Sequence, residues 1–146
     1  MNTLQQQLIE ELPKRKKAKG QLRDGNAMCC LGVACDISGV GDWTREMYCS
    51  GNESECSLTV EPVKRAFSFE GIDGCVRTGY ELHIDGSSLS ALVSINDSYH
   101  PESHALTTHL LSTYPWLFFL NVVPPEELPE EETITIEGSE YTISIT

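Results

Sequence analysis

Residues 29–36 read Cys-Cys-Leu-Gly-Val-Ala-Cys-Asp, and this stretch organises the predicted fold. It predicts a helix that begins near Cys29 and runs to about Ser38, before two glycines that end it. The three cysteines have neither disulfide nor metal-binding spacing, and they need another explanation. Helical spacing places four apolar residues on one stripe that we expect to face the core: Cys30, Val33, Ala34 and Ile37.

A second face of this helix carries Cys29, Gly32 and Asp36. Glycine inside a helix costs about 1 kcal/mol relative to alanine, so Gly32 is expected to allow a close approach. The approaching group is either another segment of the chain or a ligand, and both alternatives stay open. At the helix start, the positive end of the dipole is expected to lower the pKa of the Cys29 thiol and to favour a bound anion.

A cysteine hydrolase is one function that this helix start permits. Cys29 or Cys30 would be the nucleophile, and His83, on a strand predicted over Tyr80–Ile84, is the best-placed base. Two of the other histidines, His100 and His104, share a helical face, but no glutamate completes the usual zinc motif. The chain also has no phosphate-cradling Gly-rich loop and no Rossmann fingerprint, so we expect neither a metal nor a cofactor.

Composition favours one small α+β domain in residues 1–123, with a small antiparallel sheet and three to five short helices. An acidic, proline-rich linker, 124–132, leads to a C-terminal β-hairpin over 133–146. The longest apolar run, Trp116 to Val123, is too short to span a bilayer and predicts a buried strand. The N-terminal stretch lacks a signal-peptide pattern, so we expect a cytoplasmic protein with free thiols, in which Cys49 and Cys56 are the pair that could oxidise.

The remaining elements follow from caps, turns and apolar spacing. Strands are predicted over Ala18–Arg23, over 27–28 after an Asp-Gly-Asn turn, and over Trp43–Cys49. Helices are predicted from Asn2 or Thr3 to Pro13, from Thr59 or Glu61 through Phe67, through residues 89–95 to Asn96-Asp97, and over Pro101–Thr113.

Charge is unevenly distributed along the chain. The net charge is −12, yet six of the ten basic residues lie in the first 23 positions. The acidic body is expected to repel duplex nucleic acid. The basic cluster could bind a phosphate-bearing partner, pair with the acidic tail, or be a solvated loop. The hairpin could bury its isoleucines on its own domain or form a homodimer.

These motifs resemble those of a family of small tailed-phage proteins. The matching residues are Gly20-x-Leu22-Arg23, the motif over 29–36, Trp43, and the Leu92–Asp97 segment ending in Asn-Asp, within roughly residues 1–113. The family's usual wording is G-x-L-R, C-C-L-G-V-L-C-D and L-N-D, so this chain departs from it at Ala34 and in its C-terminal hairpin. The resemblance implies a phage accessory protein in the cytoplasm of an infected bacterial host, without implying a reaction.

We therefore expect a counter-defence protein that binds a small anionic host molecule, such as a nucleotide immune signal. Arg23 and the start of the cysteine helix would hold phosphate. The other predicted ligand-binding residues are Trp43 or Tyr80 for base stacking, Asn96 and Asp97 for polar edges, and Gly32 and Asp36 on the pocket face. One alternative is the hydrolase, acting on a nucleotide signal. Another is an acidic, protein-binding inhibitor.

Overall fold

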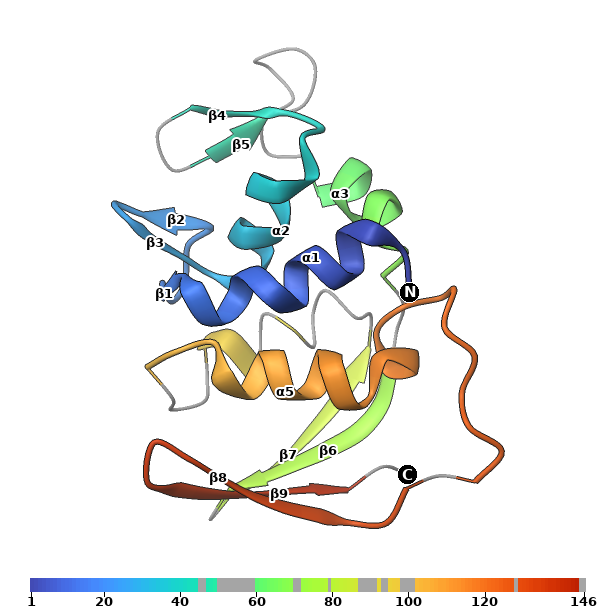
Figure 1. Cartoon of the computed structure of the whole chain (residues 1–146). Coiled ribbons are helices and arrows are strands. Elements are labelled where there is room, and N and C mark those ends of the chain that lie inside the picture. Colours follow the sequence, from blue (N-terminus) through green and yellow to red (C-terminus); the bar gives the residue numbers. More distant parts are fainter. Residues whose placement is uncertain are drawn as a thin grey trace.

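Helix α2 (Cys30–Ser38) is the element around which the N-terminal half of the chain packs (Figure 1). The computed structural model describes residues 1–44, 47–49, 60–69, 72–78, 80–86, 92, 95–97, 102–127 and 129–144, with the strands over 72–86 described by their backbone. Residues 30–35 are all buried, and α2 contacts α1 (Thr3–Glu11) and α3 (Val60–Phe67). The predicted cysteine helix is thus confirmed, with Cys30, Val33 and Ala34 of the expected stripe buried and Ile37 half-buried.

Helix α1 begins at a capping box, in which the side chains of Asn2 and Gln5 bond each other's backbone N–H groups. Gln5 is fully buried, and its amide donates to the Phe67 carbonyl at 2.6 Å and to Asn121 Oδ1 at 2.7 Å. A short 3₁₀ helix, η1 (Leu12–Lys14), follows because Pro13 ends the α-helical pattern. The predicted first helix is confirmed, as is α3 with Val63 and Phe67 buried.

A small mixed sheet follows α1, with β3 (Ala27–Met28) between β1 (Lys16–Lys17) and β2 (Arg23–Asp24). The predicted strand over Ala18–Arg23 is wrong, because residues 18–22 form a bend. Side chains from Asn96 and Asp97 bond the backbone of this bend, so its polar groups have no need of a strand partner.

The predicted strand over Trp43–Cys49 is also wrong, because this segment is a hairpin of β4 (Asp42–Thr44) and β5 (Met47–Cys49). Trp43 and Tyr48 lie opposite each other in the two strands, with ring centroids 5.2 Å apart in a T-shaped arrangement. The cross-strand aromatic pair stabilises the reversal. An apolar alternation alone does not show where such a short strand turns back.

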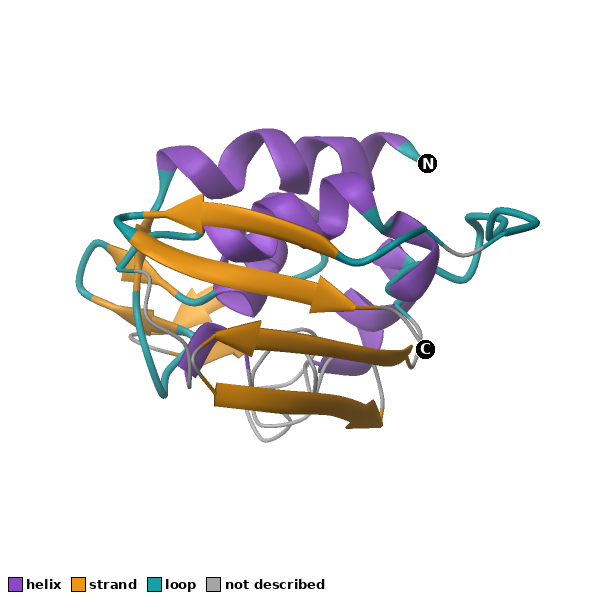
Figure 2. Cartoon of the chain, turned by 90° about the horizontal axis from the view of Figure 1, so that it is seen from below, coloured by secondary structure: helices purple, strands orange, loops and turns teal. Residues whose placement is uncertain are grey.

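A four-stranded antiparallel sheet has the strand order β7-β6-β9-β8. It comprises β6 (Ile72–Thr78), β7 (Tyr80–Gly86), β8 (Glu132–Ile136) and β9 (Ser139–Ser144). Helix α5 (Ala105–Thr113) covers one face in Figure 1, and Figure 2 shows the strands in front of the helices when viewed from below. The fold is α+β, as expected.

The predicted C-terminal hairpin is confirmed, and it lies in the same sheet as the body because β9 pairs with β6. Its side chains Tyr141 and Ile143 are buried within the chain. Glu132, at the start of β8, accepts a 2.8 Å bond from the Tyr114 hydroxyl and lies 2.6 Å from His109 Nε2. These contacts fasten the hairpin to α5, while the homodimer stays a prediction.

The predicted strand over Trp116 to Val123 is wrong. A 3₁₀ helix, η3 (Pro115–Leu117), and turns occupy this segment, and Phe119 alone forms a bridge, to Phe69. Pro115 favours a helical first turn, and its carbonyl accepts the N–H groups of Phe118 and Phe119. An apolar run this short cannot distinguish a strand from buried turns. Across the described residues, no helix is long and apolar enough to cross a membrane.

Candidate functional site

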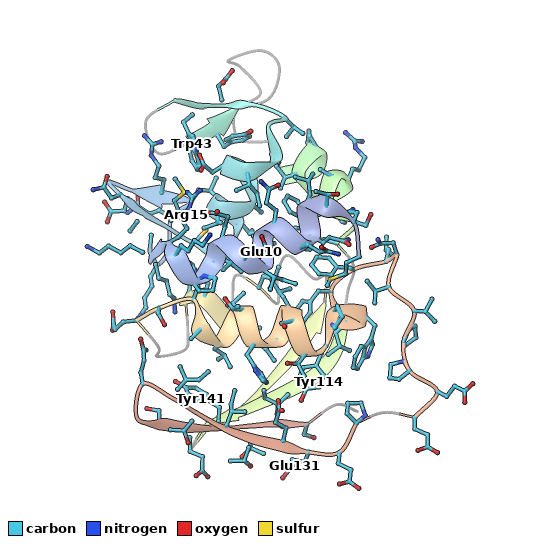
Figure 3. All side chains as sticks on the ribbon, in the orientation of Figure 1. Glu10, Arg15, Trp43, Tyr114, Glu131 and Tyr141 are labelled. Carbon is cyan, nitrogen blue, oxygen red and sulfur yellow. The ribbon has the colours of Figure 1, made fainter. Side chains whose placement is uncertain are left out.

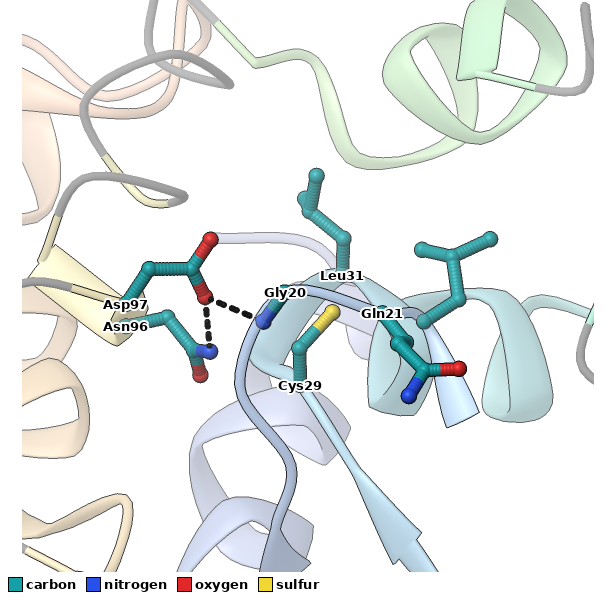
Figure 4. A pocket seen from close by; sticks show the side chains of 7 residues that line it. Gly20, Gln21, Cys29, Leu31, Asn96 and Asp97 are labelled. Atoms are coloured by element: carbon teal, nitrogen blue, oxygen red, sulfur yellow. Dashed lines mark hydrogen bonds between the residues drawn. The ribbon is translucent and has the colours of Figure 1, made fainter. Parts of the chain in front are cut away.

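Three sequence motifs meet at the start of α2, and one of them is distant in the chain, since Asn96 lies 66 positions after Cys30 (Figure 4). The buried Asn96 amide donates to the Ala18 carbonyl at 2.8 Å, and its oxygen accepts the Cys30 N–H at 3.2 Å. Asp97 Oδ1 accepts the Gly20 N–H at 3.0 Å and the Asn96 amide at 2.9 Å. Asn96 and Asp97 therefore join the bend over 18–22 to α2, and the Asn96 amide group donates both of its bonds within the chain.

Gly32 is packed against the chain itself. A Cβ atom built on Gly32 would lie 2.0 Å from the Leu22 carbonyl oxygen, which also accepts the Cys29 N–H at 3.1 Å. Of the two alternatives for the approaching group, the chain segment is the one present. The Leu22 carbonyl occupies the space beside Gly32, and the role of Gly32 in ligand binding stays a prediction.

The first turn of α2 has few free donors for an anion. Cys29 is the N-cap, and its Sγ accepts the Gly32 N–H at 3.3 Å. The Cys30 N–H is bonded to Asn96, and the Val33 N–H is bonded to the Cys29 carbonyl. Side chains and backbone of the same chain therefore already bond these donors, and the phosphate site at this helix start stays a prediction without support from free N–H groups.

The three cysteines of the motif are buried thiols. Burial raises the pKa of Cys29, although the Gly32 N–H partly offsets the effect. Burial also raises the pKa of Cys30, and together with the charge of Asp36 it raises the pKa of Cys35 to about 12. The expected lowering of the Cys29 pKa was wrong, because desolvation outweighs the helix dipole.

The predicted base, His83, is not brought to Cys29. It lies on β7 in the four-stranded sheet, where it pairs with Cys75 of β6, and Figure 1 shows the labelled parts of β6 and β7 below α5 whereas α2 lies above it. Tyr80 is on the same strand, and the side chains of both residues lie outside the described part of the structure. The predicted Cys29–His83 pair therefore has no geometric support.

We expect the motif cysteines to react slowly with iodoacetamide near neutral pH. Because a thiolate is the reacting species, burial and a raised pKa should protect Cys29, Cys30 and Cys35 in the folded chain and not in urea. Peptide mapping by mass spectrometry resolves these three sites from the other cysteines. Rapid alkylation of Cys29 in the folded protein would contradict this prediction and support the hydrolase hypothesis.

A pocket of about 190 Å³ opens beside Cys29 (Figure 4). The side chains of Leu22, Cys29 and Leu31 supply its apolar or weakly polar surface. The full lining comprises Gly20, Gln21, Leu22, Cys29, Leu31, Asn96 and Asp97. Asp97 is the ionisable carboxylate in this lining. Such a pocket suits a hydrogen-bond donor, whereas a phosphate would be repelled by Asp97.

A second cluster lies between α2, β2 and β4, and it contains the other predicted ligand residues. Asp36 accepts the Trp43 Nε1–H at 2.9 Å and a 2.9 Å bond from Arg15 Nη1, and Figure 3 shows Arg15 and Trp43 beside α2. Burial raises the pKa of Asp36, but the bonds from Trp43 and Arg15 outweigh it and the pKa is lowered. Sequence reasoning missed Arg15, because nothing local connects it to a residue 21 positions later.

Arg23 completes this cluster from β2. Its guanidinium carbon lies 4.9 Å from the centroid of the Trp43 ring, which is a cation–π contact. None of the described residues forms an ion pair with Arg23, while its positive charge helps to lower the pKa of the nearby Asp36. The structure thus brings Arg23, Asp36 and Trp43 together, and it places Asn96 and Asp97 in the separate pocket.

Comparisons of the chain with protein-family models, with curated proteins and with solved structures found no match.

Proposed function

We propose that this chain is a phage accessory protein that binds a small anionic molecule, such as a nucleotide immune signal of the host. The observation that carries the proposal is the Arg23 guanidinium, which lies on the Trp43 ring and has no ion-pair partner among the described residues. The sequence motifs support the phage origin only as a resemblance.

The chemistry of Arg23 suits phosphate. A guanidinium presents a planar fork of N–H donors that can bind two phosphate oxygens at once. Contact with Trp43 orders the side chain before a ligand arrives, which reduces the entropy lost on binding. Trp43 is itself fixed by Asp36, so the cluster is rigid on the side that faces the chain.

The surrounding charge also favours an anion at this place. Arg23 belongs to β2, and the same small sheet includes β1, whose two residues are Lys16 and Lys17. Lys19 is exposed in the adjoining bend. In a chain of net charge −12, this is the region where basic residues gather, so it is where an anion would be attracted.

Binding is favoured over hydrolysis by the state of the cysteines. A nucleophile needs an accessible thiolate and a neighbouring base. The motif cysteines of α2 are buried and have raised pKa values. His83 lies on β7, in the four-stranded sheet. Within the described structure, the motif therefore offers a scaffold for a binding surface.

Replacing Arg23 with alanine should weaken binding of a nucleotide by about tenfold to a hundredfold, since a hydrogen-bonded charge contributes about 1.5–3 kcal/mol. Isothermal titration of a panel of mono-, di- and cyclic nucleotides, with pyrophosphate included, measures the effect. Arg65→Ala is the matched control, because Arg65 is an exposed arginine on α3. Absence of binding across the panel, or equal losses in both variants, would refute the proposal.

A further inference from the structure

Strand β8 forms one edge of the four-stranded sheet, since it follows β9 at the end of the order β7-β6-β9-β8. An edge strand carries backbone N–H and C=O groups that pair with nothing in the sheet. Along β8, Thr133 and Thr135 are exposed, whereas Glu132, Ile134 and Ile136 are half-buried toward the chain. The exposed side chains of β8 itself are therefore two uncharged threonines, a residue type that favours strands.

The hairpin turn determines which backbone groups of β8 are open. Glu137 and Gly138 have φ values of 51° and 81°, and they form a two-residue turn that closes on the pair Ile136–Ser139. Antiparallel pairs alternate between bonded and non-bonded, so Ile134–Tyr141 is a bonded pair. The N–H and C=O groups of Thr133 and Thr135 consequently point away from β9, toward the open edge.

A side-chain contact supports this assignment. Residues of a non-bonded pair have their side chains closer together than those of a bonded pair. Thr133 Oγ1 and Thr142 Oγ1 lie 3.4 Å apart across the two strands. The open edge thus offers four backbone groups at the spacing that a further strand would use.

The charge around this edge indicates the chemistry of the strand that would fit it. Residues 124–146 contain seven glutamates and no lysine or arginine. Four of these side chains are exposed immediately before β8, at its turn and on β9: Glu130, Glu131, Glu137 and Glu140. A basic segment would be attracted to the edge, and an acidic one would be repelled.

A second copy of this chain fits less well. In the two-fold register that pairs Thr133 with Thr135 of another copy, Glu131 of each copy would face Glu137 of the other. Like charges directly opposite each other destabilise a strand pair, and both copies carry a net charge of −12. The charges therefore favour a different protein, and not a second copy of this chain, as the partner at this edge.

We propose that the open edge of β8 is a docking site for an extended, basic segment of a partner protein, which adds as a fifth strand beside Thr133 and Thr135. Backbone bonds would supply the pairing and the surrounding glutamates the preference for lysine and arginine. This site is separate from the Arg23–Trp43 cluster, so it does not depend on the anion-binding function. It would give the acidic C-terminal region a protein-binding role.

Amide hydrogen exchange measured by NMR tests the proposal, with the capped peptide (Lys-Val)₄ as the probe and the full chain as the target. The amides of Thr133 and Thr135 should exchange about tenfold or more slowly when the peptide is added. The amides of Ile134 and Ile136 are the internal control, because they already bond to β9. Glu140→Gln should weaken binding about threefold, and Glu10→Gln, the same change on α1, should not.

Two control peptides separate strand addition from simple charge attraction. The peptide (Glu-Val)₄ should not bind, and fully N-methylated (Lys-Val)₄, which keeps its charge and has no backbone N–H, should bind weakly without protecting Thr133 and Thr135. The proposal is overturned if (Lys-Val)₄ does not bind, or if it binds without slowing these two amides. It is also overturned if they are protected before peptide is added and the chain sediments as a dimer.

Discussion

Replacing Gly32 with alanine is expected to lower the free energy of unfolding by at least about 3 kcal/mol. The new Cβ would lie 2.0 Å from the Leu22 carbonyl oxygen and 2.9 Å from its carbon, which is far inside contact distance. The obstruction is backbone, so no side-chain rotation can relieve it. Alanine's better helix propensity, about 1 kcal/mol, offsets only part of the loss.

The same substitution should impair the binding surface. The Leu22 carbonyl accepts the Cys29 N–H, and Arg23 is the next residue, so displacing Leu22 breaks one bond and moves the guanidinium away from Trp43. Urea unfolding followed by circular dichroism measures the stability, and nucleotide titration measures the binding. Gly39→Ala is the matched control: Gly39 has φ +70° and open space around it, so only backbone strain of about 1–2 kcal/mol is expected. Equal losses in the two variants would contradict the packing role of Gly32.

Gly32 also shows how far sequence reasoning reaches. An isolated glycine among buried helix residues predicts a close approach, and that prediction is confirmed. The identity of the approaching group was not predictable, because Leu22 lies in a bend whose shape is set by hydrogen bonds to Asn96 and Asp97. Contacts between segments more than 70 positions apart leave no periodic signal in a single sequence.

The elements that could be predicted are those whose own residues carry a regular apolar pattern, and the elements that were missed lack one. Helix α2 and the β8–β9 hairpin follow directly from apolar spacing and a Glu-Gly turn. Strand β6 was missed, because Gly74 and charged residues interrupt its alternation and its stability comes from pairing with both β7 and β9. In the site, sequence reasoning named Arg23, Asp36 and Trp43, whereas the Arg15–Asp36 ion pair depends on the tertiary structure.

The substitution Asn96→Asp distinguishes two roles of the Asn-Asp motif, which are ligand binding and support of the fold. In the parent chain the Nδ2 group donates to the Ala18 carbonyl at 2.8 Å and to Asp97 Oδ1 at 2.9 Å. In the variant, a carboxylate oxygen would replace the Nδ2 donor and face two other acceptors, the Ala18 carbonyl and Asp97 Oδ1. Asn96 is only 1% exposed, so water could not separate these oxygens. Near pH 7 we expect a loss of about 3 kcal/mol or more in the free energy of unfolding.

The loss should shrink in acid, because a protonated carboxyl group can donate to the Ala18 carbonyl as the amide does. The pKa of the new group is therefore raised in the folded chain, and the fold is penalised most where pH exceeds that raised value. Stability must be compared with the parent chain at each pH from about 7 to about 4.5, because burial lowers the pKa of His104 to about 4 and the parent itself weakens in acid. Asp97→Asn, which keeps the Oδ1 acceptor at an exposed position, should change stability by less than about 1 kcal/mol. A variant that unfolds like the parent at every pH, with ligand binding lost, would make Asn96 a ligand residue instead of a structural one.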